Sequence, residues 1–157
     1  MKKIIFPVLF LLLGILYFDS CKQDTATLTP PKPRGPTLYD LLAGKTDKKW
    51  KLTKYLVNDS DATAGYDSCF LDNIYDFKRD YSYKVNEGDS LCNALDSSVY
   101  DWGSWLLDNS KNSITIISTK YSDTTMSNIL ELNSLKMRIS RTDTTISKKY
   151  EYDFTAQ

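Results

Sequence analysis

The chain contains no histidine. Histidine is the usual proton shuttle near neutral pH and the commonest metal ligand in proteins, so its absence excludes the common zinc sites and this proton shuttle but leaves carboxylate chemistry open. The chain also has no net charge, because 20 basic side chains balance 20 acidic ones. Without a basic field, we do not expect the protein to bind nucleic acid. Cysteine is scarce, with three residues in the whole sequence.

A long apolar run is present at the N-terminus, where Lys2 and Lys3 precede residues 4–18. The run is short for a membrane span but has the length and flanking charge of a secretory signal peptide. It is followed by Ser20 and Cys21, which resembles the lipobox of bacterial lipoproteins in the looser form found in Bacteroidetes. The resemblance implies cleavage before Cys21 and acylation of that cysteine, which anchors the chain in a membrane. The alternative is an ordinary signal peptide, with Cys21 free or in a disulfide.

Removal of residues 1–20 as a signal peptide leaves 18 basic and 19 acidic side chains, a net charge of −1. Residues 21–36 contain four prolines, a composition typical of an extended spacer of about 3 Å per residue. We predict a lipidated stalk there and one monomeric domain over residues 37–157. The expected location is the cell envelope at the outer membrane, on either its periplasmic or its surface side. Within the stalk, Asp24-Thr25-Ala26 resembles the O-glycosylation signal of Bacteroidetes exported proteins.

Cys69 and Cys92 lie outside the signal region. An exported chain resides where disulfides persist, so we predict that these two cysteines pair. Closing a loop of this size stabilises a fold by about 3 kcal/mol in the chain-entropy model. The alternative, a reactive or metal-binding thiol, lacks a basic partner and a ligand spacing. Asp59, Asp61 and Asp67 could hold calcium, but their spacing misses the EF-hand pattern, so we expect a solvated loop.

A short helix is predicted before a series of strands. Thr37 can cap this helix and Gly44 can end it. From Lys48 onward, apolar and polar residues alternate with a period of two, which is typical of strands. The predicted strands cover residues 49–57, 71–77, 81–85, 99–108, 113–119, 125–132, 135–142 and 147–154.

The links between these strands are short and polar, which favours antiparallel neighbours. The alternation of Leu135, Met137 and Ile139 with polar residues indicates that one face of the sheet is covered and the other is wet. An eight-stranded antiparallel up-and-down barrel buries such a face on itself and removes exposed edges. A two-sheet β-sandwich is the competing architecture, and it is favoured by the scarcity of glycine in the strands.

The sequence resembles the lipocalin-like domain of Bacteroidetes lipoproteins over residues 37–154. The likeness rests on Leu42-Ala43-Gly44, Trp50-Lys51-Leu52, Cys69, Asp72-Asn73-Ile74-Tyr75-Asp76-Phe77, Tyr83, Cys92, Gly103-Ser104-Trp105 and Ser113-Ile114-Thr115-Ile116. The resemblance implies an eight-stranded barrel related to lipocalins. It also implies a disulfide between Cys69 and Cys92 that ties the ends of the second hairpin.

The segment Gly88-Asp89-Ser90-Leu91 has the letters that name a family of serine esterases. Those enzymes need a histidine as general base, and loss of the base removes nearly all of a triad's catalysis. We therefore interpret Ser90 as a loop residue beside the disulfide. The prediction is a protein that is not an enzyme and needs neither a metal nor a cofactor.

Aromatic residues are the remaining functional signal, since tyrosine suits both a ligand pocket and a packed core. The candidate ligand-binding residues are Tyr75, Phe77, Tyr83, Trp105, Met137 and Tyr152. If they line a cavity, the barrel binds a small apolar or amphipathic molecule. If they fill the interior, the protein is a structural or interaction module that binds an envelope protein or a glycan.

Overall fold

The structure is a computed structural model, which describes residues 34–92 and 97–157. The predicted signal peptide, the acylation site at Cys21, most of the stalk and Asp24-Thr25-Ala26 lie outside the described residues. Residues 35–157 form one compact unit. This unit holds the complete sheet, its buried core and the disulfide, which is what a domain needs in order to fold alone. In the described part, no helix is long and apolar enough to cross a membrane.

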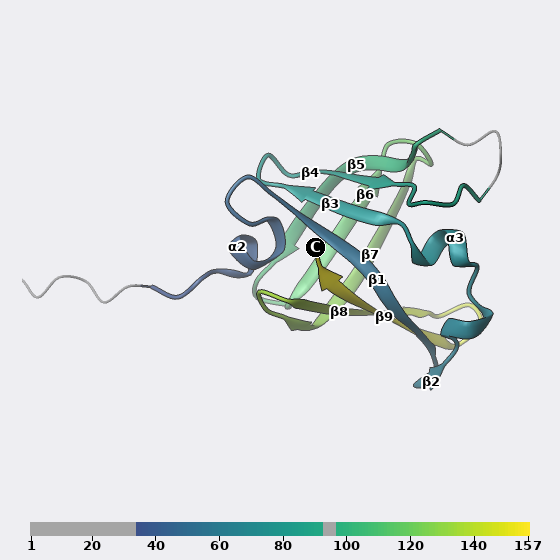
Figure 1. The fold of residues 1–157 in the computed structure, drawn as a ribbon. Coiled ribbons are helices and arrows are strands. Elements are labelled where there is room, and N and C mark those ends of the chain that lie inside the picture. The colour runs from purple at the N-terminus through teal and green to yellow at the C-terminus, as the bar shows by residue number, and fades with distance from the viewer. Residues whose placement is uncertain (1–33, 93–96) are drawn as a thin grey trace, which may run out of the picture. The chain divides into compact units, whose positions relative to one another are not determined.

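Eight antiparallel strands of the described residues form a closed barrel (Figure 1). They are β1 (Asp47–Val57), β3 (Ile74–Lys78), β4 (Ser82–Asn86), β5 (Val99–Asp108), β6 (Ser113–Ser118), β7 (Asp123–Leu132), β8 (Lys136–Asp143) and β9 (Lys148–Ala156). A two-residue strand, β2 (Ser60–Asp61), folds back on the end of β1. Each strand of the barrel pairs with the next in the chain, and β9 pairs with β1. The up-and-down barrel is therefore confirmed.

The alternative of a two-sheet sandwich is wrong, and the irregularities in the ladders explain why few glycines are needed. The register shifts between Leu52 and Lys54, between Val85 and Asn86, and between Ile129 and Glu131. Such bulges increase local twist and bend a sheet, which is how a barrel turns without a glycine at every corner.

Helix α2 (Leu38–Ala43) covers the end of the barrel at which β1 begins, and it confirms the helix predicted before the first strand. Thr37 caps it: the backbone N–H of Asp40 donates to the Thr37 hydroxyl, and the Asp40 carboxylate accepts from the Thr37 N–H. The indole Nε1 of Trp50 donates to the carbonyl of Leu42 at 2.9 Å. Both side chains are fully buried, so this end of the barrel is closed.

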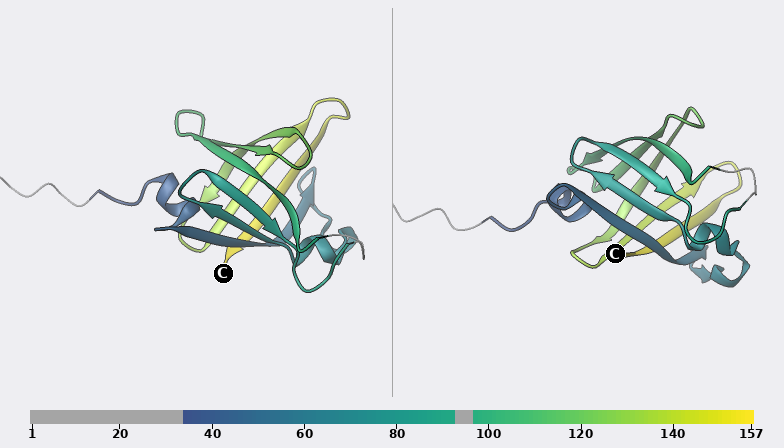
Figure 2. Two further views of the ribbon diagram at one scale, coloured as in Figure 1. Left: turned by 90° about the horizontal axis from the view of Figure 1, so that it is seen from above. Right: turned by 45° about the horizontal axis from the view of Figure 1, so that its top comes forward.

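The opposite end carries the long loop after β1, with a 3-10 turn η1 (Thr63–Gly65) and helix α3 (Ser68–Leu71). Figures 1 and 2 show α2 and α3 at opposite ends of the barrel. We call the end beside α3 the mouth. The predicted second strand began at Leu71, but β3 begins at Ile74, because the chain completes α3 before it enters the sheet.

A disulfide joins Cys69 in α3 to Cys92, with 5.1 Å between the Cα atoms, as predicted. The segment Gly88-Asp89-Ser90-Leu91 lies beside it. The Ser90 N–H donates to the Asp72 carboxylate at 2.9 Å, and a Cβ on Gly88 would lie 2.3 Å from the Asp72 carbonyl oxygen. Gly88 and Ser90 therefore have a structural role, because both contact Asp72.

Candidate ligand site in the barrel

A cavity of about 110 Å³ lies inside the barrel. Its lining consists of Tyr75, Phe77, Tyr83, Val85, Asp101, Ile114, Ile116, Met137, Ile139 and Phe154. An engineered apolar cavity of about 150 Å³ is known to bind benzene, whereas typical drug-sized ligand pockets begin near 300 Å³. The interior is thus neither filled nor wide, and it has room for a small molecule or for one end of a larger one.

Four of the six predicted ligand-binding residues line this cavity, namely Tyr75, Phe77, Tyr83 and Met137. Trp105 is not among the lining residues. It is fully buried, its Nε1 donates to the carbonyls of Lys78 and Ser82, and its ring lies 5.4 Å from that of Tyr39 in α2. Trp105 is therefore a core residue at the closed end of the barrel.

Tyr152, the sixth candidate, lies above the cavity at the mouth. It pairs with Ile139 across the β8–β9 ladder, so both side chains face the interior. Its ring lies 5.4 Å from the ring of Tyr55 and 5.8 Å from the guanidinium carbon of Arg141. The structure therefore places Tyr152 beside the entrance rather than in the cavity lining.

Asp101 is the one carboxylate in the cavity lining. It accepts hydrogen bonds from the Tyr83 hydroxyl at 2.6 Å, from the Ser118 hydroxyl at 2.7 Å and from the Trp102 N–H at 2.8 Å. Burial and the bond to Asp101 both raise the pKa of Tyr83, so Tyr83 remains a donor at neutral pH. Sequence reasoning missed Asp101, because a single acidic residue at the start of a strand carries no pattern.

Aromatic side chains form a continuous series around the mouth. Ring centroids are separated by 4.5 Å between Tyr55 and Tyr66, by 5.8 Å between Tyr66 and Phe70, and by 5.5 Å between Phe70 and Tyr100. Phe70 follows Cys69 in α3, so the disulfide helps to hold this part of the series. The mouth therefore offers aromatic surface above the apolar cavity.

The tyrosines of the mouth, and Tyr75 of the cavity lining, are protonated at neutral pH. Burial raises the pKa of Tyr66 and of Tyr75, and burial together with the hydrogen bond to the Tyr121 side chain raises the pKa of Tyr100 to about 12. The hydroxyls of Tyr55, Tyr66 and Tyr75 form no hydrogen bond with other described residues. These phenols are therefore free to donate to a ligand.

At the mouth, the ends of β7 and β8 separate, although the two strands are paired further inside the barrel. Their ladder runs only from the pair Asn128–Ser140 to the pair Leu132–Met137, and residues 123–127 of β7 pair with β6 alone. A groove of about 320 Å³ lies at this separation. Its lining is polar for the most part and consists of Thr124, Thr125, Met126, Arg141, Thr142, Asp143 and Tyr150.

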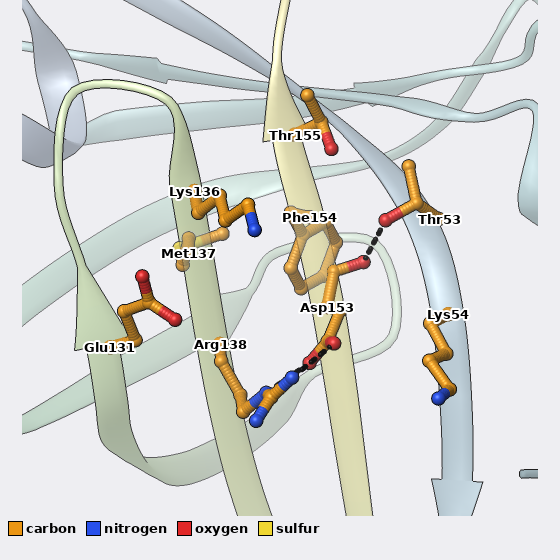
Figure 3. A pocket seen from close by; sticks show the side chains of 9 residues that line it. All are labelled: Thr53, Lys54, Glu131, Lys136, Met137, Arg138, Asp153, Phe154 and Thr155. Atoms are coloured by element: carbon orange, nitrogen blue, oxygen red, sulfur yellow. Dashed lines mark hydrogen bonds and ion pairs between the residues drawn. The ribbon is translucent and has the colours of Figure 1, made fainter.

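A further hollow of about 270 Å³ involves β1, β8 and β9 (Figure 3). The Arg138 guanidinium forms two hydrogen bonds with the Asp153 carboxylate, at 2.5 and 2.6 Å. The Thr53 hydroxyl donates to the Asp153 carbonyl at 3.1 Å. These contacts join the three strands to each other, so the hollow is a feature of sheet packing.

Among residues 34–92 and 97–157, no group of three metal-ligating side chains is placed to hold a metal ion. Two of the aspartates considered for calcium have other partners. Asp59 lies 2.9 Å from the ammonium of Lys149, and Asp61 accepts from the Thr63 N–H at 3.0 Å.

A closed antiparallel barrel with a helix over one end, an aromatic mouth at the other and an apolar cavity between them is typical of proteins that hold a small molecule in a barrel. The sequence model for the lipocalin-like domain matches residues 46–139, which is more than half of the chain. The chain therefore belongs to the lipocalin-like domain family, a fold that generally binds ligands and is not enzymatic. A comparison with curated proteins gave no match.

Proposed function

We propose that this protein is an exported lipoprotein, anchored through acylated Cys21, whose barrel binds one small apolar or amphipathic molecule. The internal cavity carries the binding part of the proposal, because its lining is apolar apart from Asp101 and the tyrosine hydroxyls. Membership of the lipocalin-like family supports it. No turnover is involved, and the protein holds its ligand close to a membrane.

The size of the cavity limits how tightly a wholly enclosed ligand can bind. The best small ligands gain about 1.5 kcal/mol per non-hydrogen atom, and a volume of about 110 Å³ holds few such atoms. A ligand that continues from the cavity into the mouth gains further contacts with Tyr55, Tyr66 and Tyr152. We therefore favour an amphipathic ligand over a purely apolar one.

The anchor can be tested by replacing Cys21 with serine in the full-length chain. We expect the native chain to incorporate a labelled fatty acid and to sediment with membranes, and the C21S variant to lose the label and become soluble after export. Acylation is the physical cause, because two or more acyl chains give stable membrane attachment. A native chain that is exported without any label would instead support an ordinary signal peptide.

The binding site can be tested with two neighbouring isoleucines of β6. Ile116 lines the cavity, whereas Ile117 is exposed on the outer face. We expect native mass spectrometry of residues 35–157, purified from the host envelope without detergent, to show a bound small molecule. Ile116→Phe should abolish that extra mass because the larger ring occupies the cavity, and the matched Ile117→Phe should retain it.

A bare polypeptide mass that also takes up neither benzene nor butanol would contradict the binding proposal. That outcome would favour the second candidate, an interaction module. An observation supports this alternative. Trp102, Leu106 and Met126 are exposed on the outer face of β5 and β7. Polar residues such as Ser104 and Thr115 lie between them. The outer side of β8 and β9 carries charged residues instead, such as Lys136 and Asp153.

A further inference from the structure

The interior of the barrel changes from apolar to polar between the cavity and the mouth. The β8–β9 ladder shows this in three successive inward pairs: Met137 with Phe154, Ile139 with Tyr152, and Arg141 with Tyr150. The first pair and Ile139 line the cavity, and the third pair lines the groove at the mouth. Inward residues on one strand are about 7 Å apart. The guanidinium of Arg141 is therefore the next inward group after Ile139, on the mouth side of the apolar cavity.

Arg141 differs from the other arginines of the barrel domain. Arg79 pairs with Asp40 at 2.8 Å and Arg138 pairs with Asp153 at 2.5 Å. Arg141 has no ion pair with any described residue. Its guanidinium carbon lies over the rings of Tyr150 and Tyr152, at 5.5 and 5.8 Å. The guanidinium also hydrogen-bonds with the Tyr152 hydroxyl. An arginine side chain has five N–H donors, so this contact and the ring stacking orient the guanidinium and leave other donors available.

Two aspartates flank the groove: Asp143 lines it two residues after Arg141, and Asp123 precedes Thr124, which also lines it. Both carboxylates accept from nearby backbone N–H groups. The Asp143 carboxylate accepts from the Thr145 N–H at 2.9 Å. The Asp123 carboxylate accepts from the Thr124 N–H at 2.7 Å. Neither forms an ion pair with Arg141, so the charge of the guanidinium is not cancelled by a direct partner.

The phenols around Arg141 add donors of the same kind. Burial raises the pKa of Tyr55, of Tyr66 and of Tyr152, so all three remain protonated at neutral pH. Protonated phenols and a guanidinium supply hydrogen-bond donors and no carboxylate. A phenol can also accept, but a guanidinium only donates, so the ligand group that satisfies Arg141 is an acceptor, and an anionic acceptor gains the most.

We propose that the ligand carries a carboxylate, which Arg141 and the mouth tyrosines bind while its apolar end occupies the cavity. This inference rests on the proposed ligand-binding function and names its ligand class: small amphipathic carboxylates. A guanidinium suits a carboxylate because its planar fork can make two parallel hydrogen bonds. The separation of β7 from β8 provides the groove, about 320 Å³, in which the head group and its water lie.

Titration calorimetry with matched probes tests the proposal. The ligands are straight-chain carboxylates from butanoate to octanoate and the alcohols of equal chain length, and the protein is residues 35–157. We expect each carboxylate to bind more tightly than its alcohol. Arg141→Gln should weaken carboxylate binding about tenfold, the loss expected for one charge-assisted hydrogen bond, and should leave alcohol binding unchanged.

Two further variants separate recognition from structure. Arg138→Gln removes a guanidinium from the outer face of the same strand, and its carboxylate affinities should equal those of the native domain. Arg141→Lys keeps the charge without the fork and should give intermediate affinities. If Arg141→Gln binds carboxylates as the native domain does, or if alcohols match carboxylates in the native domain, the head-group assignment is wrong. If neither series binds the native domain, the ligand-binding function itself is wrong.

Discussion

Replacing Trp105 with alanine should lower the free energy of unfolding by about 3–5 kcal/mol, the range measured for buried tryptophan or phenylalanine. Trp105 has an exposed fraction of 0%, and its removal leaves a cavity that backbone strands cannot collapse to fill. Its Nε1 also satisfies the carbonyls of Lys78 and Ser82, at 3.1 and 3.0 Å. Loss of these two side-chain hydrogen bonds adds to the cost of the cavity, although the Lys78 carbonyl still accepts from the Tyr81 N–H at 3.1 Å.

Trp102 provides the matched control for this substitution. It lies on the same strand, faces outward and has an exposed fraction of 42%, so Trp102→Ala should change stability by no more than about 1 kcal/mol. Urea unfolding of residues 35–157, followed by far-UV circular dichroism, gives both values. Equal losses in the two variants would contradict the assignment of Trp105 to the core of the closed end.

The barrel could be predicted because side-chain alternation reports the face that each residue occupies. Met137 and Ile139 read as inward from the sequence, and the ladder places them opposite Phe154 and Tyr152 inside the barrel. The helix that ends before Gly44 was equally predictable, because the capping residue and the terminating glycine are local signals. Side-chain alternation and helix capping depend on neighbours in the chain, so they can be read from the sequence.

Other features depend on contacts between distant segments and could not be predicted from local patterns. Leu71 reads as the start of a strand, but α3 forms there, and the disulfide links this helix to Cys92. Tyr81 also reads as a strand residue. It adopts φ 67° in the turn before β4, and its ring packs on Trp105 at 5.2 Å. The tertiary contact overrides the usual preference for glycine at such a φ.

The candidate site was only partly predictable, because alternation gives the face of a residue but not its height along the barrel axis. Trp105 and Tyr83 both face inward, yet Trp105 packs at the closed end and Tyr83 lines the cavity. The difference arises because α2 covers one end of the barrel and its Tyr39 packs on Trp105. Asp101 and Arg141 were missed because a single charged residue within a strand carries no pattern of its own, and charged residues are usually expected on the outer face. Such exceptions are where functional residues are expected.

Alkaline pH should destabilise the barrel, because desolvation raises the pKa of several half-buried tyrosines in the folded state. The ordinary pKa of tyrosine is 10.0, and burial raises the pKa of Tyr75 above that value in the folded protein. Unfolded chains therefore release the Tyr75 proton first as pH rises past 10. The contribution of this group to stability is fully present below pH 10 and is lost as pH rises toward the folded pKa. The pKa of Tyr66 and that of Tyr152 are raised in the same direction.

The effect of Tyr75 can be isolated, because its hydroxyl forms no hydrogen bond with other described residues. Tyr75→Phe should therefore match the native domain at neutral pH. Above pH 10, each retained proton lowers stability by about 1.4 kcal/mol per pH unit. At about pH 11, Tyr75→Phe should therefore be more stable than the native domain by up to about 1.4 kcal/mol. Urea unfolding at both pH values, with tyrosinate absorbance as a second signal, measures this difference. If stability falls equally in both proteins, Tyr75 titrates as a solvated phenol and the interior around it is wet.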